Sequence, residues 1–510
     1  MSLWLPVLLA LFISVLGGLH LLGVFRRRRP KEPPLDKGHI PWLGHALDFK
    51  NNKVEFLQKM QRKHGDIFTV QIGGNCITFV MDPFSFGSIL NVTRSKMDMN
   101  PIVKQLVARA FGYHHLENEH KVMEATNKHL MGDGLVVLTQ TMMKNLQNLM
   151  LHSIGTVKNQ KEWQYDGLLH YSSNTVFQAG YLSLFGNETV KSMGSKEKAE
   201  EFDWVHSEEL FNEFRKYDSL FPNLVYAMLS LKDKLEAERL KRLFWNVLSF
   251  KKIMQKDNVS RWIIDHLQLR QEQGMAEYMQ ARFMFVLLWG SQSNTGPASF
   301  WLLFFLMKHP EAFKAVKEEV EKVLKETNQE VKPGGPLINL TRDMLMKTPI
   351  LDSTVEETLR LMSAPGLIRA IMQDMDFKMA DGREYALRKG DRIGIFPYIS
   401  VHMDLEIHPE PHQFKYDRFL SPDGIRRTSF YKNGKKVKYF TMPWGGGISM
   451  CPGRFLATNE LKQFVFLMLV YFDIELVNAE EENPPIDQNR VGFGIVHPTR
   501  DIQFRYKLRF

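Results

Sequence analysis

A glycine-rich loop that ends in one of only two cysteines constrains this chain more than any other segment. It runs from Phe440 to Arg454 and reads Phe-Thr-Met-Pro-Trp-Gly-Gly-Gly-Ile-Ser-Met-Cys-Pro-Gly-Arg. An apolar helical pattern follows Cys451 and continues to about Tyr471, so the loop delivers a thiol to the start of a helix. Pro452 suits the first helical position, and the N–H groups of a helix start favour a thiolate at Cys451.

The sequence around Cys451 limits its chemistry. The other cysteine is Cys76, and no cluster of Cys and His has zinc-binding spacing, which excludes a closed zinc site. Two cysteines also exclude a disulfide framework. A lone thiolate can be the single axial ligand of a haem iron, and the glycines let the backbone approach a large flat group. A buried structural cysteine beside a flexible loop is the alternative.

The N-terminus predicts a membrane anchor. Residues 2–25 contain no Asp, Glu, Lys or Arg, and four arginines, Arg26 to Arg29, follow directly. A helix of this length spans roughly 36 Å, enough to cross a hydrocarbon core of about 30 Å with tilt. The arginines predict a cytosolic C-terminal flank, and a cleaved signal peptide would carry basic residues before the apolar run. We expect a transmembrane signal anchor over residues 1–25, with a buried helix as the alternative, and a basic, proline-rich linker over 26–45 that acts as a stiff spacer.

The rest of the chain predicts one large domain over residues 46–510, mainly α with small β-sheets. Strand-like runs flank Gly73-Gly74, and a second hairpin is indicated around Asp381-Gly382. Residues 83–370 are mostly helical, and 502–510 alternate like a strand. The net charge of +9 does not by itself argue for nucleic acid, so no nucleic-acid partner is expected.

Residues 283–307 are almost wholly apolar around a polar centre, Gly290 to Pro297. In a second transmembrane helix this centre would lie at the bilayer midplane, where it is costly, so we prefer a long helix through the protein core. Pro297 has no N–H for the carbonyl of Ser293, which predicts a kink or opening. A freed carbonyl beside Asn294 is a place to hold water or a small polar ligand.

Several segments together resemble the cytochrome P450 superfamily, over essentially the whole chain. The haem loop of that family, Phe-x-x-Gly-x-(Arg/His)-x-Cys-x-Gly, is matched at Trp444, Gly447, Cys451 and Gly453, with Trp in place of Phe and Ser449 in place of the basic residue. The resemblance implies the cytochrome P450 fold in a single haem domain. It also implies haem b, with Cys451 as the axial ligand of the iron.

Two further motifs fit this resemblance. Glu357-Thr358-Leu359-Arg360 matches the family's Glu-x-x-Arg, and Phe414 to Phe419 matches the downstream segment that carries a second arginine, Arg418. By resemblance, Glu357, Arg360 and Arg418 form a buried network that locks the cysteine loop. These three residues would be structural.

Asn294-Thr295-Gly296-Pro297 and Cys451-Pro452-Gly453-Arg454 resemble the bile-acid branch of the superfamily. This implies a monooxygenase that hydroxylates a sterol, at the 12α position of 7α-hydroxycholest-4-en-3-one in bile acid synthesis. It implies O2 as cosubstrate and electrons from NADPH through NADPH–cytochrome P450 reductase. It also implies a single-pass protein of the endoplasmic reticulum membrane, in contact with membrane lipid, whose catalytic domain is cytosolic.

The wider family guides protons to bound oxygen with an acid followed by a threonine, and those positions read Ser293 and Asn294 here. Asn294 either orients a water in a proton relay beside Ser293 and Thr295, or no relay is needed and the protein is an endoperoxide isomerase of the prostacyclin-synthase type. The branch motifs favour the hydroxylase. A 7α-hydroxylase of the same branch is a further alternative, and a haem-based sensor is the non-enzyme alternative.

Other candidate residues line the pocket or contact partners. Trp289 is a candidate wall above the haem, with an ordinary core aromatic as the alternative, and Phe493 lies in a segment that resembles the family's terminal pocket loop. By resemblance, Arg369 reaches a haem propionate, with Lys128 or His129 as weaker candidates.

Two surface segments are candidates for contact with partners. Residues 220–229 are unusually apolar for a connection and predict a second membrane contact, with a buried loop as the alternative. Lys432, Lys435, Lys436 and Lys438 predict a docking site for an acidic reductase surface, with a solvated charge run as the alternative.

Overall fold

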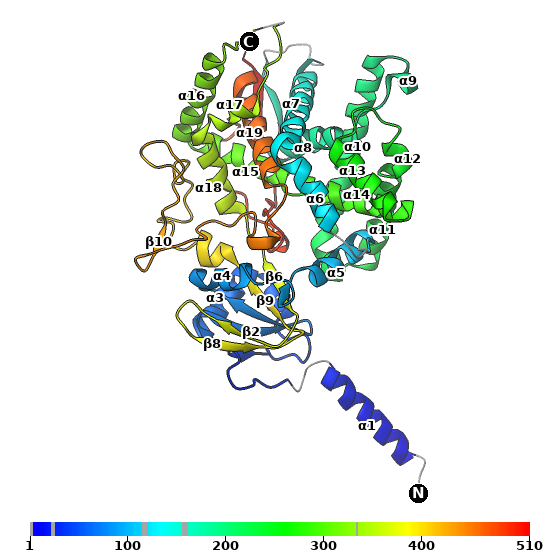
Figure 1. Ribbon diagram of the computed structural model, residues 1–510. Coiled ribbons are helices and arrows are strands. Elements are labelled where there is room, and N and C mark those ends of the chain that lie inside the picture. Colours follow the sequence, from blue (N-terminus) through cyan, green and yellow to red (C-terminus); the bar gives the residue numbers. More distant parts are fainter. Residues whose placement is uncertain (1–3, 22–25, 115–119, 156–161, 333–334, 510) are drawn as a thin grey trace.

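The computed structural model describes residues 4–21, 26–114, 120–155, 162–332 and 335–509, and its body is mainly helical (Figure 1). The longer helices are α1 (Trp4–Leu21), α2 (Ala46–Asn51), α3 (Lys53–His64), α5 (Asn100–Phe111), α6 (His120–Leu130), α7 (Gly132–Gly155), α8 (Leu168–Phe185), α10 (Lys196–Val225), α11 (Leu231–Val247), α13 (Arg261–Glu272), α14 (Glu277–Gln292), α15 (Thr295–Lys308), α16 (Pro310–Glu326), α18 (Pro349–Met362) and α19 (Arg454–Tyr471). Short helices are α4 (Gly87–Leu90), α9 (Val190–Met193), α12 (Phe250–Ile253) and α17 (Arg342–Met346).

The main sheet has six strands in the order β1-β2-β3-β9-β6-β4, and it lies at one end of the body, beside α3 and α4 (Figure 1). Its strands are β1 (Leu35–Asp36), β2 (Ile67–Ile72), β3 (Asn75–Val80), β4 (Met97–Asp98), β6 (Leu367–Ile371) and β9 (Arg392–Ile395). The smaller sheets join β7 (Met375–Lys378) to β8 (Glu384–Leu387), β10 (Tyr431–Lys432) to β11 (Lys435–Lys436), and β12 (Phe472–Leu476) to β13 (Gln503–Leu508) and β5 (Gln164–Gly167).

Both predicted hairpins and the C-terminal strand are confirmed. β2 and β3 pair antiparallel up to Ile72 and Asn75, around a two-residue turn. Gly73 and Gly74 have φ of 53° and 77°, and two successive positive φ values are what a tight hairpin turn of this twist needs. The Asp381-Gly382 pair lies in the turn between β7 and β8, and β13 covers most of the predicted tail strand.

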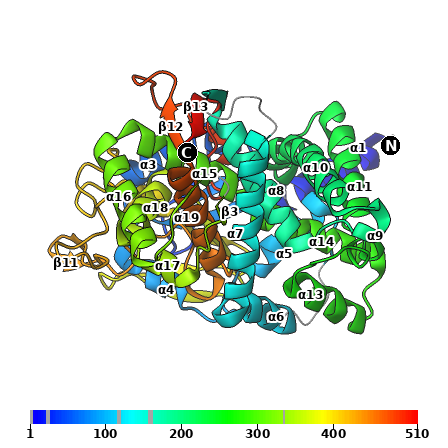
Figure 2. The same cartoon turned by 90° about the horizontal axis from the view of Figure 1, so that it is seen from above.

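The apolar segment around residue 293 crosses the core, as predicted. α14 ends at Gln292 and α15 begins at Thr295, so the helix opens at Ser293-Asn294. Pro297 is the third residue of α15, where a missing N–H costs little because first-turn N–H groups have no helical acceptor. The following turn packs Trp301 and Phe304 completely out of solvent. Figure 2 shows α15 inside the body, with α8 on one side and α18 and α19 on the other, so the break lies in the middle of the protein.

The N-terminal helix α1 stands apart from the body in Figure 1. Apolar side chains along it, from Val7 to Leu16, are exposed. Among the helices of the described residues, none combines the length and apolarity needed to cross a membrane.

The segment predicted as a stiff spacer is docked on the domain. Arg26 makes two hydrogen bonds to the Asp391 carboxylate, of 2.7 and 2.5 Å. Glu32 is buried and pairs with Arg388, and Leu35–Asp36 adds β1 to the main sheet, parallel to β2. The second half is attached as well, since the Gly74 N–H donates to the Trp42 carbonyl at 2.7 Å and the His45 N–H to the Gln71 carbonyl at 2.8 Å. The expectation of a spacer over residues 26–45 is therefore corrected: ion pairs and backbone hydrogen bonds attach this segment to the folded body.

Candidate active site

The cysteine loop reaches α19 slightly differently from the prediction. α19 begins at Arg454 with Gly453 as its N-cap residue, so Pro452 precedes the helix and does not occupy its first position. The Cys451 N–H donates to the Trp444 carbonyl at 2.9 Å, which closes the loop between the two residues. The Arg454 side chain donates to the Cys451 carbonyl at 2.9 Å. Because the chain turns tightly here, the thiol is only partly exposed.

Opposing effects act on the Cys451 thiol. Burial raises its pKa, and the backbone N–H groups of Gly453 and Arg454, with the Arg454 charge, lower it. The predicted preference of the helix start for a thiolate is therefore present, but burial outweighs it. Coordination to a metal deprotonates a thiol outright, so an iron ligand at this position does not depend on that balance.

Gly447 brings the loop against α4. Its φ is 62°, and a Cβ at this position would overlap the Leu90 carbonyl oxygen, so only glycine fits. Arg369 on β6 is buried and donates to the Ile89 carbonyl at 2.6 Å and the Leu90 carbonyl at 3.4 Å. The structure thus places Arg369 behind the segment that touches the cysteine loop. A guanidinium has five N–H donors, so these two bonds leave further donors.

The structure brings Glu357, Arg360 and Arg418 together in the core. The Glu357 carboxylate accepts from Arg360 Nε at 2.7 Å and Nη2 at 2.9 Å, and from Arg418 Nε at 2.9 and 3.0 Å. None of the three side chains is more than 5% exposed. Arg418 also donates to three backbone carbonyls, between 2.7 and 3.2 Å. The carboxylate is thereby paired on both oxygens, as a buried charge requires.

Two histidines connect this network to the cysteine loop. Arg360 donates to the His402 carbonyl at 2.5 Å, and the His402 ring accepts the Met442 N–H at Nε2, 2.9 Å away. His408 donates from Nε2 to the Phe440 carbonyl at 2.7 Å. Burial, with the nearby Arg360 charge, lowers the pKa of His402 to about 3 and that of His408 to about 2. Neither role could be predicted from residue spacing, because both histidines act on backbone atoms of distant segments.

One face of α14 is not packed against side chains. Leu288 and Gln292 are buried, but Gly290 between them is exposed, and Val286 and Asn294, one turn to either side, are only half-buried. Residues four apart share a helix face. A Cβ on Gly290 would meet no atom within 4 Å. This face therefore borders open space.

A row of glycines joins that space to the cysteine loop. A Cβ on Gly445 would lie 3.5 Å from the Leu367 side chain. Gly366, which precedes Leu367 in the chain, donates its N–H to the Gly492 carbonyl at 3.1 Å. The loop that starts at Gly492 continues to Ile495, whose N–H donates to Asn294 Oδ1 at 2.9 Å. These contacts bring the cysteine loop, residues 366–367, the loop from Gly492 and the break after α14 next to one another. Cys451 offers a single thiolate, and the described part of the chain holds no cluster of three or more His, Cys, Asp or Glu that could bind a metal, which fits a haem held by one cysteine beside the open face of α14.

The helix break uses all three of the predicted catalytic residues, in different ways. Pro297 leaves the Ser293 carbonyl free of a helix hydrogen bond, and this carbonyl accepts one from the buried His497 ring. A side chain of the protein therefore occupies the carbonyl that was predicted to bind water or a ligand. Asn294 holds Ile495 through Oδ1, and its amide nitrogen is 3.4 Å from Ser293 Oγ. The Thr295 hydroxyl donates to the Ser291 carbonyl at 3.0 Å.

The predicted pocket residues Trp289 and Phe493 lie around one aromatic ring. The Trp289 indole stacks on Phe221 at 4.0 Å between ring centroids, and Phe493 meets the same ring edge-on at 5.7 Å. Trp289 also donates its indole N–H to Asp218 at 3.0 Å. The structure therefore places both residues beside the open face of α14 and adds α10 to the pocket wall.

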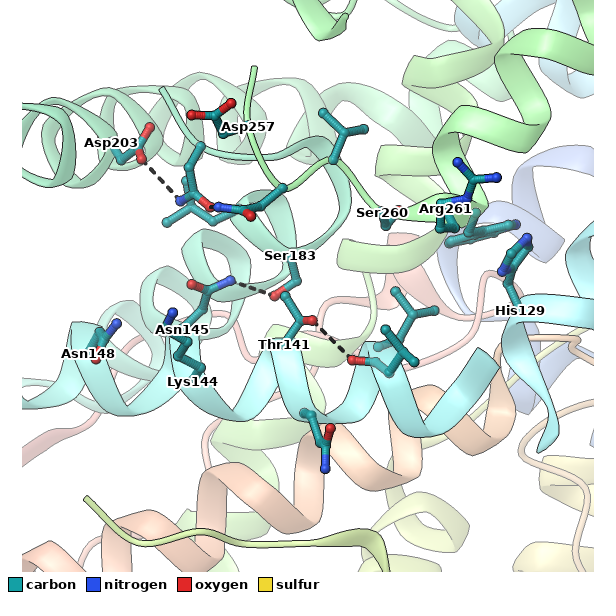
Figure 3. Close-up of a pocket in the computed structure, with 18 of the residues that line it drawn as sticks. His129, Thr141, Lys144, Asn145, Asn148, Ser183, Asp203, Asp257, Ser260 and Arg261 are labelled. Atoms are coloured by element: carbon teal, nitrogen blue, oxygen red, sulfur yellow. Dashed lines mark hydrogen bonds between the residues drawn. The ribbon is translucent and has the colours of Figure 1, made fainter. Parts of the chain in front are cut away.

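Lys128 and His129 lie beside Asp265 and away from the cysteine loop. Lys128 Nζ is 3.1 Å from Asp265 on α13, with 68% of its side chain exposed, and His129 pairs with the same carboxylate at 2.8 Å. Both line a groove of about 1250 Å³ between α7, α8, α10 and residues 257–262 (Figure 3). The described residues of the groove include none from the cysteine loop or α14. The structure does not bring Lys128 to Cys451.

Haem-thiolate enzymes are the class to which this helical fold and its lone, helix-start cysteine point. The sequence model of the cytochrome P450 family matches residues 33–505, and the chain belongs to the cytochrome P450 family. It is 49% identical to the 7-alpha-hydroxycholest-4-en-3-one 12-alpha-hydroxylase of Homo sapiens, over 100% of this chain and 99% of that protein. It is 41% identical to prostacyclin synthase of Homo sapiens, over 94% of this chain and 95% of that protein.

A solved structure supports the fold. Retinoic acid bound cyanobacterial CYP120A1 superposes with a TM-score of 0.68 over 94% of this chain and 100% of that chain, at 19% identity. The chain is therefore a cytochrome P450 enzyme, a monooxygenase similar to sterol 12α-hydroxylases, and membership of the family implies haem.

Proposed function

We propose that this enzyme hydroxylates a sterol, specifically carbon 12, on the α face, of 7α-hydroxycholest-4-en-3-one in bile acid synthesis. The observation that carries the proposal is the full-length match at 49% identity to a protein with that activity. The site is compatible with such a substrate, because Trp289, Phe221 and Phe493 supply flat apolar walls beside the open face of α14.

The haem would be held by Cys451 as the iron ligand, with Trp444, Gly447 and Gly453 shaping the loop behind it. When bound, haem uses O2 and two electrons from NADPH, supplied by NADPH–cytochrome P450 reductase, to insert one oxygen atom into a C–H bond. Arg369 is the candidate for a propionate, since it is buried behind the loop and has spare N–H donors. Lys128 is the weaker candidate, because it pairs with Asp265.

The protein's own residues would orient the sterol and hold protons in place. Asn294 and Ser293 lie at the helix break, where an amide and a hydroxyl can order a water for proton delivery. Thr295 fixes the start of α15 by its bond to Ser291. The apolar walls would exclude other water from the reacting carbon.

Turnover of purified full-length enzyme with reductase, NADPH and 7α-hydroxycholest-4-en-3-one tests the proposal. We expect a single 12α-hydroxylated product, and a thiolate-type Soret band in the reduced, carbon-monoxide-bound protein that Cys451→Ala abolishes. A different hydroxylated carbon would reject the 12α assignment. Formation of a 7α-hydroxylated product from cholesterol would favour the 7α-hydroxylase alternative.

An endoperoxide isomerase is the second candidate. The absence of a carboxylic acid at Ser293, together with the 41% identity to prostacyclin synthase, favours it. Such an isomerase needs neither NADPH nor reductase. Rearrangement of a prostaglandin endoperoxide without either one, and no sterol turnover with both, would select it over the hydroxylase.

We propose that the enzyme is anchored in the endoplasmic reticulum membrane by residues 1–25, with its catalytic domain in the cytosol. Exposed apolar side chains on α1 and the arginines that follow support this. Several apolar side chains of residues 220–229 are buried, Phe221, Leu224 and Leu229 among them, so the alternative of a buried segment holds for these residues. A second membrane contact is proposed at the exposed apolar side chains beside them, Met228, Leu231 and Leu235, which are 40%, 76% and 67% exposed. Deleting residues 1–29 should leave part of the protein membrane-bound, and complete release at moderate salt would reject the second contact.

We propose that reductase docks beside the cysteine loop. Lys435, Lys436 and Lys438 are exposed, and Lys432 is paired with Asp404. A cleft of about 400 Å³ between α18 and the loop, lined by half-exposed Met450, lies nearby. Changing the three exposed lysines to glutamate should slow reductase-driven turnover and flatten its salt dependence, without changing the sterol Kd; unchanged kinetics would reject the docking site.

A further inference from the structure

A buried carboxylate that the sequence did not single out joins three elements around the pocket. Asp218 lies on α10 with 3% of its side chain exposed. Its oxygens accept from Arg490 Nη1 and Nη2, each at 3.1 Å, and Oδ1 also accepts the Trp289 indole N–H at 3.0 Å. Arg215, one turn earlier on α10, adds a second positive charge nearby. Asp218 thus links α10, α14 and the loop that carries Arg490.

The same contacts continue to the helix break. Arg490 Nη2 lies 2.8 Å from His497 Nε2. A guanidinium can only donate, so Nε2 is the acceptor and the single ring proton of His497 is on Nδ1. That ring hydrogen-bonds the free Ser293 carbonyl. The carboxylate on α10 is therefore connected, through two side chains of the terminal loop, to the backbone where α14 ends.

The aromatic contacts show that the hydrogen bonds of Asp218 fix the position of the Trp289 ring and of the loop that carries Phe493. The Trp289 ring stacks on Phe221, which is three residues after Asp218 on α10. Phe493, three residues after Arg490, meets Phe221 and, at 5.6 Å, Tyr226. A stacked ring alone can slide in its plane, whereas a hydrogen bond from the indole N–H to a fixed carboxylate sets its position. Asp218 provides that bond and also holds the loop that carries Phe493.

We propose that Asp218 is a positioning residue for substrate specificity, which holds the Trp289 indole and the Phe493 loop against the pocket and so determines which sterol carbon is presented for oxidation. The proposal rests on the proposed sterol hydroxylase function. It assigns to Asp218 no contact with substrate or haem: its effect passes through Trp289 and, by way of Arg490, through the loop that carries Phe493.

A double-mutant cycle tests this. Trp289→Phe keeps the stacked ring but removes the indole N–H, and Asp218→Asn keeps the shape of the side chain but removes the charge. We expect each single variant to yield oxidation products at additional carbons and to weaken sterol binding, measured by the sterol-induced spin shift, by about tenfold or more, because a charged hydrogen bond is lost. We expect the double variant to be no worse than the more severe single variant.

Asp203→Asn is the matched control. Asp203 is also a buried acid on α10, but it lines the groove of Figure 3, where it accepts from Asn187 at 3.1 Å and the Glu188 N–H at 2.9 Å. We expect it to lower stability without changing the product distribution. If Asp218→Asn behaves like Asp203→Asn, or if the effects of Asp218→Asn and Trp289→Phe add independently, the proposal is overturned.

A second measurement distinguishes a failure of the Asp218 proposal from a failure of the proposed sterol hydroxylase function. A phenyl-substituted imidazole, whose ring nitrogen binds haem iron, reports on the pocket wall by its spectral Kd whatever the natural substrate. The same non-additive pattern with this probe would uphold the positioning role of Asp218 even if no sterol is turned over. Unaltered probe affinity in all three variants would reject it.

Discussion

Lowering the pH should destabilise the cysteine loop, because protonation of His402 removes the acceptor for the Met442 N–H. The His402 ring is completely buried, donates from Nδ1 towards the Ser363 carbonyl at 3.2 Å and accepts the Met442 N–H at Nε2. A protonated ring has no acceptor, so the Met442 bond requires the neutral form. Its pKa of about 3 in the folded protein, against about 6.5 in an unfolded chain, follows from this burial and from the Arg360 charge.

The direction and the size of the change in folding stability with pH follow from the difference between the folded and unfolded pKa of His402. Because the folded pKa is the lower one, the unfolded chain binds the proton first, and the contribution of His402 is complete above about pH 6.5 and is lost as the pH falls towards 3. At pH 5 the loss is 1.5 pH units at about 1.4 kcal/mol each, or about 2 kcal/mol. For a chain of this size the unfolding entropy is about 1 kcal/mol/K, so this equals about 2 °C in Tm.

The assay is Tm against pH, from 7.5 to 5, for wild type and His402→Gln. Glutamine can accept the Met442 N–H and donate to the Ser363 carbonyl, yet it does not titrate. We expect the variant to lose about 2 °C less than wild type between pH 6.5 and 5, whatever its Tm at neutral pH. His412→Gln, at an exposed position in the same segment, should keep the wild-type slope. Equal slopes for wild type and His402→Gln would refute the reasoning.

Three further substitutions test other parts of the site. Gly447→Ala should displace the cysteine loop from α4 and convert the carbon-monoxide Soret band to the form of a lost thiolate, visible by absorbance. Arg418→Leu, which leaves the Glu357 carboxylate half-paired, should cost about 3–5 kcal/mol in unfolding free energy, whereas exposed Arg427→Leu should cost under about 1 kcal/mol in the same denaturant titration. Asn294→Thr replaces the amide oxygen that accepts the Ile495 N–H by a hydroxyl on a shorter side chain, and it should lower the ratio of product formed to NADPH consumed; an unchanged ratio would exclude a special role for Asn294.

Features encoded by neighbouring residues were predictable from the sequence. The Gly73-Gly74 turn, the helix that ends at Tyr471 and the opening before Pro297 each depend on the conformational limits of a few consecutive residues. The grouping of Glu357, Arg360 and Arg418 was expected from resemblance, because no local rule connects residues 58 or 61 positions apart in a chain.

The parts that escaped prediction depend on contacts between distant backbone and side-chain atoms. His402 and His408 act on Met442 and Phe440, and nothing in the spacing of these residues indicates it. Asp218 looks like one more acid on an amphipathic helix, and its role exists only because the terminal loop brings Arg490 272 residues back to it. The attachment of residues 26–45 has the same cause, since Arg26 pairs with Asp391, which lies 365 residues further along the chain.

The cysteine loop and the pocket wall both depend on hydrogen bonds made by neutral histidine side chains. On the cysteine side, His402 and His408 hold the loop with neutral rings. On the pocket side, burial and the Arg490 charge lower the pKa of His497 well below its usual range, and its neutral ring is what accepts from Arg490 and reaches Ser293. The charge of Arg360 lowers the pKa of His402 and of His408, and that of Arg490 lowers the pKa of His497, so a nearby cation as well as burial keeps each ring neutral. Protonation would remove the nitrogen that accepts from Met442 on the loop side and the one that accepts from Arg490 on the pocket side, so both haem retention and sterol binding should weaken in acid.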